Sequence, residues 1–332
     1  MSQNIETSST LRPSECWLDV TVLFAGLQVP APIELAPEVS VEQILEANIV
    51  ANAVKIATEV QLGLPSNPED PMHPVCGLRY RVRGRRLLGA EESRFNDAQI
   101  KGPKLAFTRA VALMRGLELL HGGTFVHELD SVGNRRLYSY QFNSGYLSVH
   151  YDAAYFDGAH ADEMRRVFAA TRDPYLTSEG TSIGVAIDRL GVAAIRSNQV
   201  DMNLDLCIAA EIAFLFGLQR RIDNEKIAET IRENARAFFG DGEFFWSRDD
   251  VFQIVRDSYK QRSDTVHGRR GTDPQRDAVL TPLNVRLREV LKACLLAYAE
   301  RRPTKASAKA LWPARVKALA QGATLEQIFA GL

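Results

Sequence analysis

An arginine and a histidine lie five residues apart in YKQRSDTVHG, residues 259–268, near the end of a run typical of a helix. Arg262 stays charged and presents a planar fork that suits phosphate. His267 can move protons in either direction near neutral pH. Without a metal, such a pair can promote attack of an RNA 2′-hydroxyl on its own phosphodiester, because the histidine exchanges protons and the arginine stabilises charge developing on phosphorus. The two residues are therefore candidate catalytic groups for RNA cleavage.

The spacing by itself does not establish this chemistry. Five residues correspond to about 140° around an ideal helix, so Arg262 and His267 share a face only if the turn distorts near Gly268. The chain holds a second pair, Arg115 and His121, in a mostly apolar run where a structural role is expected. The plain alternative for the first pair is a solvated arginine and a histidine whose charge suits a helix C-terminus.

Two further residues are candidates for supporting the pair. Glu211 lies in the otherwise apolar run 201–218, and a buried carboxylate needs a partner. Arg262 is one candidate partner and a neighbouring helix another, so Glu211 either holds the arginine without touching substrate or is structural. Ser263 is the polar residue directly after the arginine.

Basic residues around the pair are candidates for binding RNA. Lys260 precedes Arg262, and Arg269 and Arg270 follow His267 in the polar loop HGRRGTDPQRD. Phosphates are contacted mainly by such side chains. The alternative is that the loop is simply a solvated basic segment.

The second half of the chain consists of helical patterns with short breaks. Apolar faces joined by short connections are typical of an all-α up-and-down bundle, which we predict for residues 160–332. The expected helices are 161–171, 182–196, 201–218, 224–239, 248–266, 281–300 and 314–330.

The first half mixes both kinds of secondary structure. Residues 1–15 are polar and expected to be a disordered tail, and residues 16–158 are expected to form an α+β domain that senses or binds something. The expected strands are 17–25, 76–82, 124–129, 136–142 and 146–151, and the expected helices are 41–60 and 105–120.

Composition excludes several classes of protein. With 332 residues, 45% hydrophobic and 24% charged, the chain is expected to be globular with about two domains. The net charge is −1, but residues 259–332 hold fourteen Lys/Arg against six Asp/Glu, so this part carries +8 and the remainder −9. An anionic partner is therefore plausible at the C-terminal end only.

No membrane span, secretory signal or metal-ligand motif is expected. The longest apolar run contains Glu211, the N-terminus is polar, and the six histidines lack metal-ligand spacing. The four cysteines are far apart and form no CxxC pair. They are Cys16, Cys76, Cys207 and Cys294. We therefore expect a cytoplasmic protein with reduced thiols, no metal and no cofactor.

The motif and its neighbours resemble the HEPN domain family, specifically the ApeA-like kind found in bacterial anti-phage proteins. The resemblance includes RSDTVHG (262–268) and Ala186–Gly217, which is similar to the family's opening two helices with their Arg-rich connection and central glutamate. It also includes Ile227–Gly240, similar to the helix before the motif helix, and covers roughly residues 180 to 300.

The resemblance implies an all-α bundle that usually dimerises and brings two motifs into one cleft. Many members are metal-independent endoribonucleases of defence or toxin systems. Carried over, Arg262 is the phosphate-binding arginine and His267 the catalytic histidine, and Ser263 stands where many active members have Asn, Asp or His. Arg269 stands where toxins regulated by a nucleotidyltransferase have a modified tyrosine, so that control is not expected. The product would carry a 2′,3′-cyclic phosphate, because the attacking group comes from the RNA.

Two other functions remain open. One is a non-catalytic HEPN module that binds RNA, a nucleotide or a protein partner, which Ser263 and the near-neutral net charge favour. The other is a structural dimerisation domain. In the leading interpretation the acidic N-terminal part restrains the basic C-terminal domain, because a constitutive ribonuclease would be toxic to its host.

Overall fold

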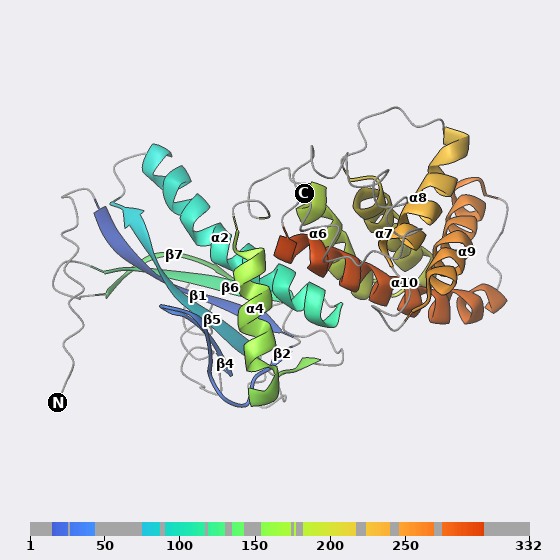
Figure 1. Ribbon diagram of the computed structural model, residues 1–332. Helices are drawn as coiled ribbons and strands as arrows, with labels where there is room; N and C mark the ends of the chain where they lie inside the picture. The colour runs from blue at the N-terminus through green and yellow to red at the C-terminus, as the bar shows by residue number, and fades with distance from the viewer. Residues whose placement is uncertain are drawn as a thin grey trace. The chain divides into compact units, whose positions relative to one another are not determined.

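The computed structural model describes residues 15–25, 27–43, 75–86, 90–116, 119–129, 135–142, 154–173, 176, 182–216, 224–239, 246–268 and 274–301 (Figure 1). The chain divides into two compact units: unit 1 contains Met1–Leu105 and Leu120–Arg165, and unit 2 contains Ala106–Leu119 and Arg166–Leu332. The sequence analysis expects a single boundary near residue 160. In the structure, Ala106–Leu119, which precedes that boundary, also belongs to the helical unit. An antiparallel sheet followed by a helical region agrees with the predicted α+β and all-α layout.

Unit 1 contains an antiparallel six-stranded sheet in the order β3-β4-β5-β1-β6-β7. Its strands are Glu15–Ala25 (β1), Ile33–Ala36 (β3), Val39–Gln43 (β4), Val75–Arg85 (β5), Leu120–Leu129 (β6) and Arg135–Phe142 (β7). A short parallel pair joins β2 (Leu27–Gln28) to β8 (Ala154–Tyr155). Strand side chains alternate between faces, and in β1 this buries Leu18, Val20 and Val22 on one face.

Helix α2 (Ala90–Arg115) is attached to the sheet by polar contacts at its N-terminal half. Asn96 exchanges two hydrogen bonds with the backbone of Arg85, both 2.7 Å long, and Tyr80 Oη donates to the Ile100 carbonyl at 2.5 Å. A Cβ at Gly84 would lie 2.6 Å from Leu18 of β1 and 3.1 Å from Asn96 Oδ1, so glycine leaves room there for both side chains. These contacts anchor the start of α2 within unit 1.

Two predictions for this half were wrong at their boundaries. Residues 41–43 were expected to begin a helix but belong to β4, because Val39 and Val41 alternate as a strand against β5. The helix expected at residues 105–120 begins at Ala90, ends at Arg115 and contains Pro103 in its interior, a position that proline usually disfavours. The rest of the predicted 41–60 helix, the 146–151 strand, the 314–330 helix and residues 1–14 of the tail lie outside the described residues.

His121 makes the stability of unit 1 depend on pH. Its Nε2 lies 2.7 Å from Thr124 Oγ1, and burial together with the positive charge of Lys104 lowers the pKa of His121 to about 4. The unfolded chain, with a histidine pKa near about 6.5, binds the proton first as the pH falls, so the free energy of unfolding should decrease between about pH 6.5 and pH 4. Urea unfolding should show a smaller decrease over this range for His121→Gln than for the wild type. Equal pH dependence in the two proteins would contradict the prediction.

Unit 2 is helical, and its described helices follow the sequence prediction closely. They are α6 (Ser182–Ala194), α7 (Gln199–Phe214), α8 (Asn224–Phe238), α9 (Arg248–Val266) and α10 (Pro274–Arg301), together with the second half of α4 (Ala161–Thr171), whose first residues belong to unit 1. The bounds of α4 and α9 agree with the expected ranges, whereas α10 begins earlier, at a proline that suits a first helical position. In α9, Ser247 caps the N-terminus with Asp250, and Gly268 follows the C-terminus with a positive φ of 61°.

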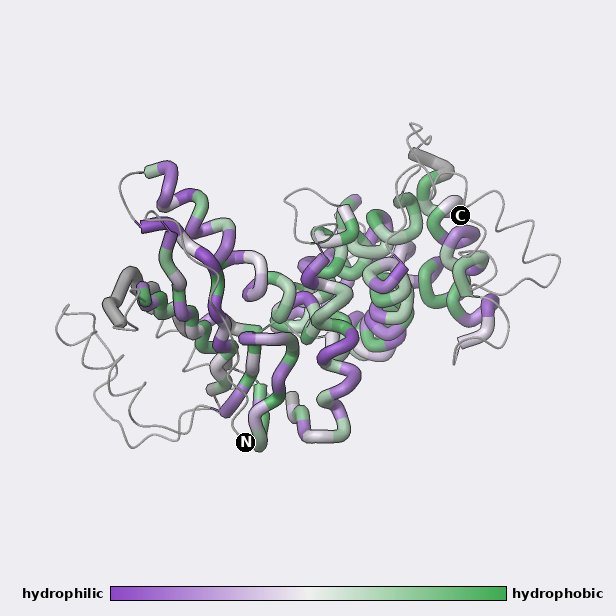
Figure 2. Tube along the Cα trace, turned by 60° about the vertical axis from the view of Figure 1, so that its left-hand side comes forward, coloured by the Kyte–Doolittle hydropathy of each residue, from purple (hydrophilic) through white to green (hydrophobic). Residues whose placement is uncertain are grey.

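Helix α7 is the central helix of unit 2, as its apolar sequence predicts. It packs against α6, α8, α9 and α10, and Figure 2 shows hydrophobic residues along these helices. The aromatic residues Phe238 and Phe239, at the C-terminal end of α8, are both fully buried. Tyr298 contacts the Phe238 ring at a centroid distance of 5.8 Å and donates a hydrogen bond from Oη to the Ala213 carbonyl at 3.1 Å.

A buried arginine joins the end of α2 to α6 within unit 2. Arg109 makes two contacts with Asp188, at 2.8 and 2.7 Å, and donates to the carbonyl of Leu176. A Cβ at Gly184 would lie 2.7 Å from Arg109 Nη1, so glycine makes room for the guanidinium. Gly184→Ala should therefore lower the free energy of unfolding by about 1–3 kcal/mol.

The role of Arg109 in that loss can be measured with a double-mutant cycle. Because the clash is with the guanidinium, Gly184→Ala should cost much less when Arg109 is replaced by methionine. Chemical denaturation of the four proteins gives both costs. An equal cost in both backgrounds would mean that Gly184 is needed for another reason.

Candidate functional site

Helices α7 and α9 bring Glu211 and Arg262 together. Glu211 Oε1 lies 3.0 Å from Arg262 Nη2, and the two side chains are 28% and 32% exposed. Glu211 is thus half-buried, less buried than the apolar run around it indicated, and its partner is the arginine that the sequence identified as a candidate. One Nη of the guanidinium is used by the carboxylate, and the exposed fraction leaves other N–H donors accessible to an anion from solvent.

The Tyr259 ring packs against the Arg262 guanidinium. Arg262 lies over the Tyr259 ring, with Cζ 5.6 Å from the centroid, and Tyr259 Oη donates to the Cys207 carbonyl at 3.3 Å. Burial, and secondly the negative charge of Glu211, raises the pKa of Tyr259, and burial also raises the pKa of Cys207. Both groups therefore stay protonated at neutral pH, and Tyr259 acts as a donor and as a face for the guanidinium.

His267 ends the motif helix and is exposed. It lies just beyond α9 with φ −89° and ψ 7°, and its backbone N–H donates to the Ser263 carbonyl at 3.0 Å. Gly268 N–H donates to the Thr265 carbonyl at 3.0 Å. These two bonds close the last turn, and the imidazole is left accessible to a ligand in solvent.

The predicted site residues fall into two groups on α9. Arg262 faces α7 through its contact with Glu211, whereas Lys260 and His267 are both exposed and, being seven residues apart, lie on one side of the helix. Ser263 is partly exposed and holds His267 through its carbonyl. The predicted RNA-binding residues Arg269 and Arg270 lie outside the described residues.

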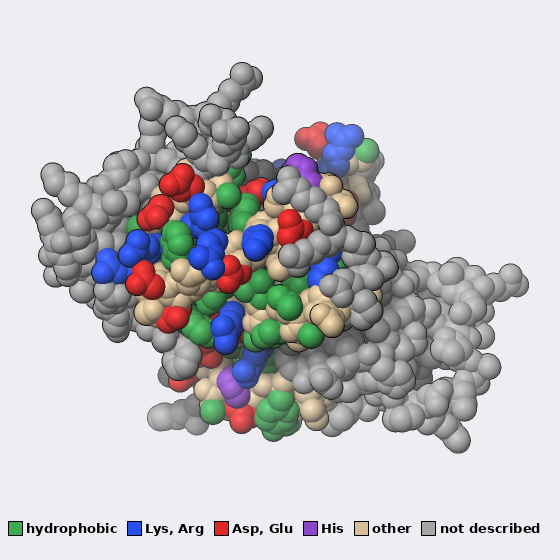
Figure 3. Space-filling model, turned by 90° about the vertical axis from the view of Figure 1, so that its right-hand side faces the viewer, with side chains coloured by type: hydrophobic (Ala, Val, Ile, Leu, Met, Phe, Trp, Pro, Cys, Tyr) green, Lys and Arg blue, Asp and Glu red, His purple; other side chains and the backbone are tan. Residues whose placement is uncertain are grey.

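Charge on the surface of this region is mixed. Figure 3 shows basic, acidic and apolar side chains interspersed on the described part of one face, so a broad basic surface is not seen there. Several of the arginines are paired with carboxylates, such as Arg236 with Asp249 at 3.0 Å. Binding of a nucleic acid would therefore depend on a few positions.

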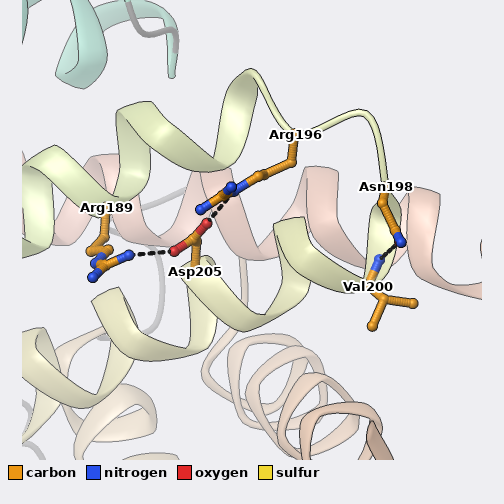
Figure 4. Close-up of polar contacts among 5 residues, drawn as sticks. All are labelled: Arg189, Arg196, Asn198, Val200 and Asp205. Carbon is orange, nitrogen blue, oxygen red and sulfur yellow. Dashed lines mark hydrogen bonds and ion pairs between the residues drawn. The ribbon is translucent and has the colours of Figure 1, made fainter.

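The sequence interpretation missed a second arginine–carboxylate cluster. Asp205, on α7, is only 5% exposed at its side chain and binds Arg189 at 2.8 Å and Arg196 at 2.7 Å (Figure 4). The two arginine side chains are themselves 43% and 42% exposed, so it is the carboxylate that is buried. Asp205, a carboxylate in an apolar helix like Glu211, was the available signal.

A third arginine, Arg276 at the start of α10, was also missed by the sequence analysis. It lies against the end of α9.

Within the described ranges, no group of three His, Cys, Asp or Glu side chains could hold a metal ion, and no helix is long and apolar enough to cross a membrane. No protein-family profile, curated protein or solved structure matches the chain.

Proposed function

We propose that unit 2 is a HEPN-type, metal-independent endoribonuclease domain. The observation that carries the proposal is the motif helix itself. Arg262 is oriented by Glu211 and Tyr259 but remains partly exposed, and His267 follows it at the exposed end of the same helix. The resemblance of residues 186–217 and 227–240 to the helices around the HEPN motif adds support.

In this reaction the 2′-hydroxyl attacks the adjacent phosphorus, and the bond from phosphorus to the 5′-oxygen breaks. His267 takes the proton of the 2′-hydroxyl or returns one to the leaving 5′-oxygen. Arg262 binds the phosphate through N–H groups that Glu211 does not use, and Lys260, Arg269 and Arg270 bind neighbouring phosphates. The products carry a 2′,3′-cyclic phosphate and a 5′-hydroxyl.

The biological setting belongs to the same proposal. The enzyme is cytoplasmic, works as a homodimer through the helical unit, and serves defence or a toxin system under restraint by the N-terminal unit. Deleting residues 1–160 is a poor test of that restraint, because it would also remove Arg109, which binds Asp188 inside unit 2. A test of restraint therefore has to keep Ala106–Leu119.

The proposal is tested by incubating the purified full-length protein with RNA in EDTA. We expect cleavage fragments whose 3′ ends resist ligation until the cyclic phosphate is removed. Cleavage that requires an added divalent ion, or fragments with 5′-phosphates, would refute this chemistry.

One observation favours a second function. Arg262 is already paired with Glu211, which reduces the positive charge available to stabilise a transition state, so a non-catalytic module that binds RNA, a nucleotide or a protein is the second candidate. RNA binding without turnover in the same assay would support that function instead.

A further inference from the structure

Arg276 is a buried cation at the end of the motif helix. Its side chain extends from the first turn of α10, the residue is 8% exposed, and Nη2 donates to the Gln261 carbonyl at 3.2 Å. Nη2 also hydrogen-bonds Thr265 Oγ1, which itself donates to the Gln261 carbonyl at 2.8 Å. The guanidinium therefore contacts α9 on both sides of Arg262, one residue before it and three after it.

Within the described part of the chain, this placement leaves polar atoms of Arg276 and Gln261 unpaired. Arg276 Nε and Gln261 Oε1 are buried without a hydrogen-bond partner among the described residues. A buried charge with an unpaired donor is unfavourable, whereas a positive charge near a helix C-terminus is favourable. An apolar side chain of similar volume would fill the same space without an unpaired donor. Stability alone therefore does not explain an arginine at this position.

The last turn of α9 sets where His267 lies relative to Arg262. In an ideal helix the two positions differ by about 140°, so their relation depends on the residues after Val266. Those residues leave the helix with Gly268 at a φ of 61°, and Gly268 N–H bonds to the carbonyl of Thr265, the residue whose side chain Arg276 holds.

We propose that Arg276 is a positioning residue for the Arg262–His267 motif: it fixes the C-terminal turn of α9 through Gln261 and Thr265 and so sets the position of His267. The effect on catalysis rests on the proposed function, whereas the effect on the turn does not. Residues that orient metal ligands change affinity or activity about 10–100-fold when they are replaced, and we expect an effect of that order here.

The experiment compares Arg276→Gln and Thr265→Val with the wild type in the full-length protein. Arg286→Gln is the matched control, because Arg286 is exposed on the same helix. Amide hydrogen exchange is read at His267 and Gly268, whose N–H groups close the turn, and at buried amides of α7. Steady-state RNA cleavage is measured in parallel.

We expect exchange at His267 and Gly268 to become about tenfold faster in both variants, with little change in α7 or in the control. The kcat for cleavage should fall about 10–100-fold with KM little changed, because Arg276 does not contact the RNA. Equal acceleration throughout α7, α9 and α10 would reduce Arg276 to a general stabiliser, and unchanged exchange at the turn would also overturn the proposal. If the wild type does not cleave RNA, the proposed function fails, but the exchange data still decide the role of Arg276.

Discussion

Cleavage of RNA in EDTA should fall about 10²–10⁴-fold when His267 is replaced by alanine, because general acid–base catalysis typically contributes that much. The imidazole is exposed at the end of α9, and its backbone N–H, which the substitution keeps, makes the bond to Ser263. The fold should therefore be retained. Initial rates on a labelled RNA measure the loss, and thermal unfolding measures the stability.

The control for this substitution is His160→Ala. His160 lies in unit 1, where its Nδ1 is 2.8 Å from Asp157, and neither residue belongs to the motif. The control should cleave RNA at the wild-type rate. Wild-type cleavage by the His267 variant would remove His267 from the mechanism.

Arg262→Ala should lower the rate about 10²–10³-fold, since a single group that stabilises transition-state charge contributes on this scale. This substitution also removes the cation that pairs with Glu211 and uncovers the Tyr259 ring. A moderate loss of stability is therefore expected together with the loss of activity. The same initial-rate assay and urea unfolding separate the two effects.

Helix positions in unit 2 were largely predictable from the sequence because local signals agree there. Ser247 and Asp250 form a capping box at the start of α9 and Gly268 ends it, so both bounds were marked. Unit 1 was less predictable. Pro103 lies inside α2, and Val41 pairs with Leu78 of β5, a partner far along the chain that no local pattern reveals.

The candidate site was predictable only where a residue conflicts with its surroundings. Glu211 is a carboxylate in an apolar helix, so the need for a cation pointed to Arg262 before the ion pair was seen. Arg276 gave no such signal, because it lies within the polar, basic run HGRRGTDPQRD, in which one more arginine is ordinary. Its burial depends on how α10 packs against α9, which a single sequence does not reveal.

Glu211→Gln should lower kcat for RNA cleavage about 10–100-fold while RNA binds at least as tightly as to the wild type. Glutamine keeps the size of the side chain and an oxygen that can accept from Arg262 Nη2, but it removes the negative charge. The arginine then attracts phosphate more strongly and is held less firmly over Tyr259. Binding and cleavage should therefore change in opposite directions.

The opposite changes distinguish positioning from a purely structural role. If Glu211 only stabilised the packing of α7 on α9, Glu211→Gln would lower the unfolding temperature and leave kcat unchanged. If it orients Arg262 for the reaction, the substitution should have no further effect on kcat in an Arg262→Ala background, because the group it positions is gone. Glu233→Gln, at an exposed glutamate of α8, is the matched control and should change neither quantity. An additive loss in the double variant would show that Glu211 acts by a route that does not involve Arg262.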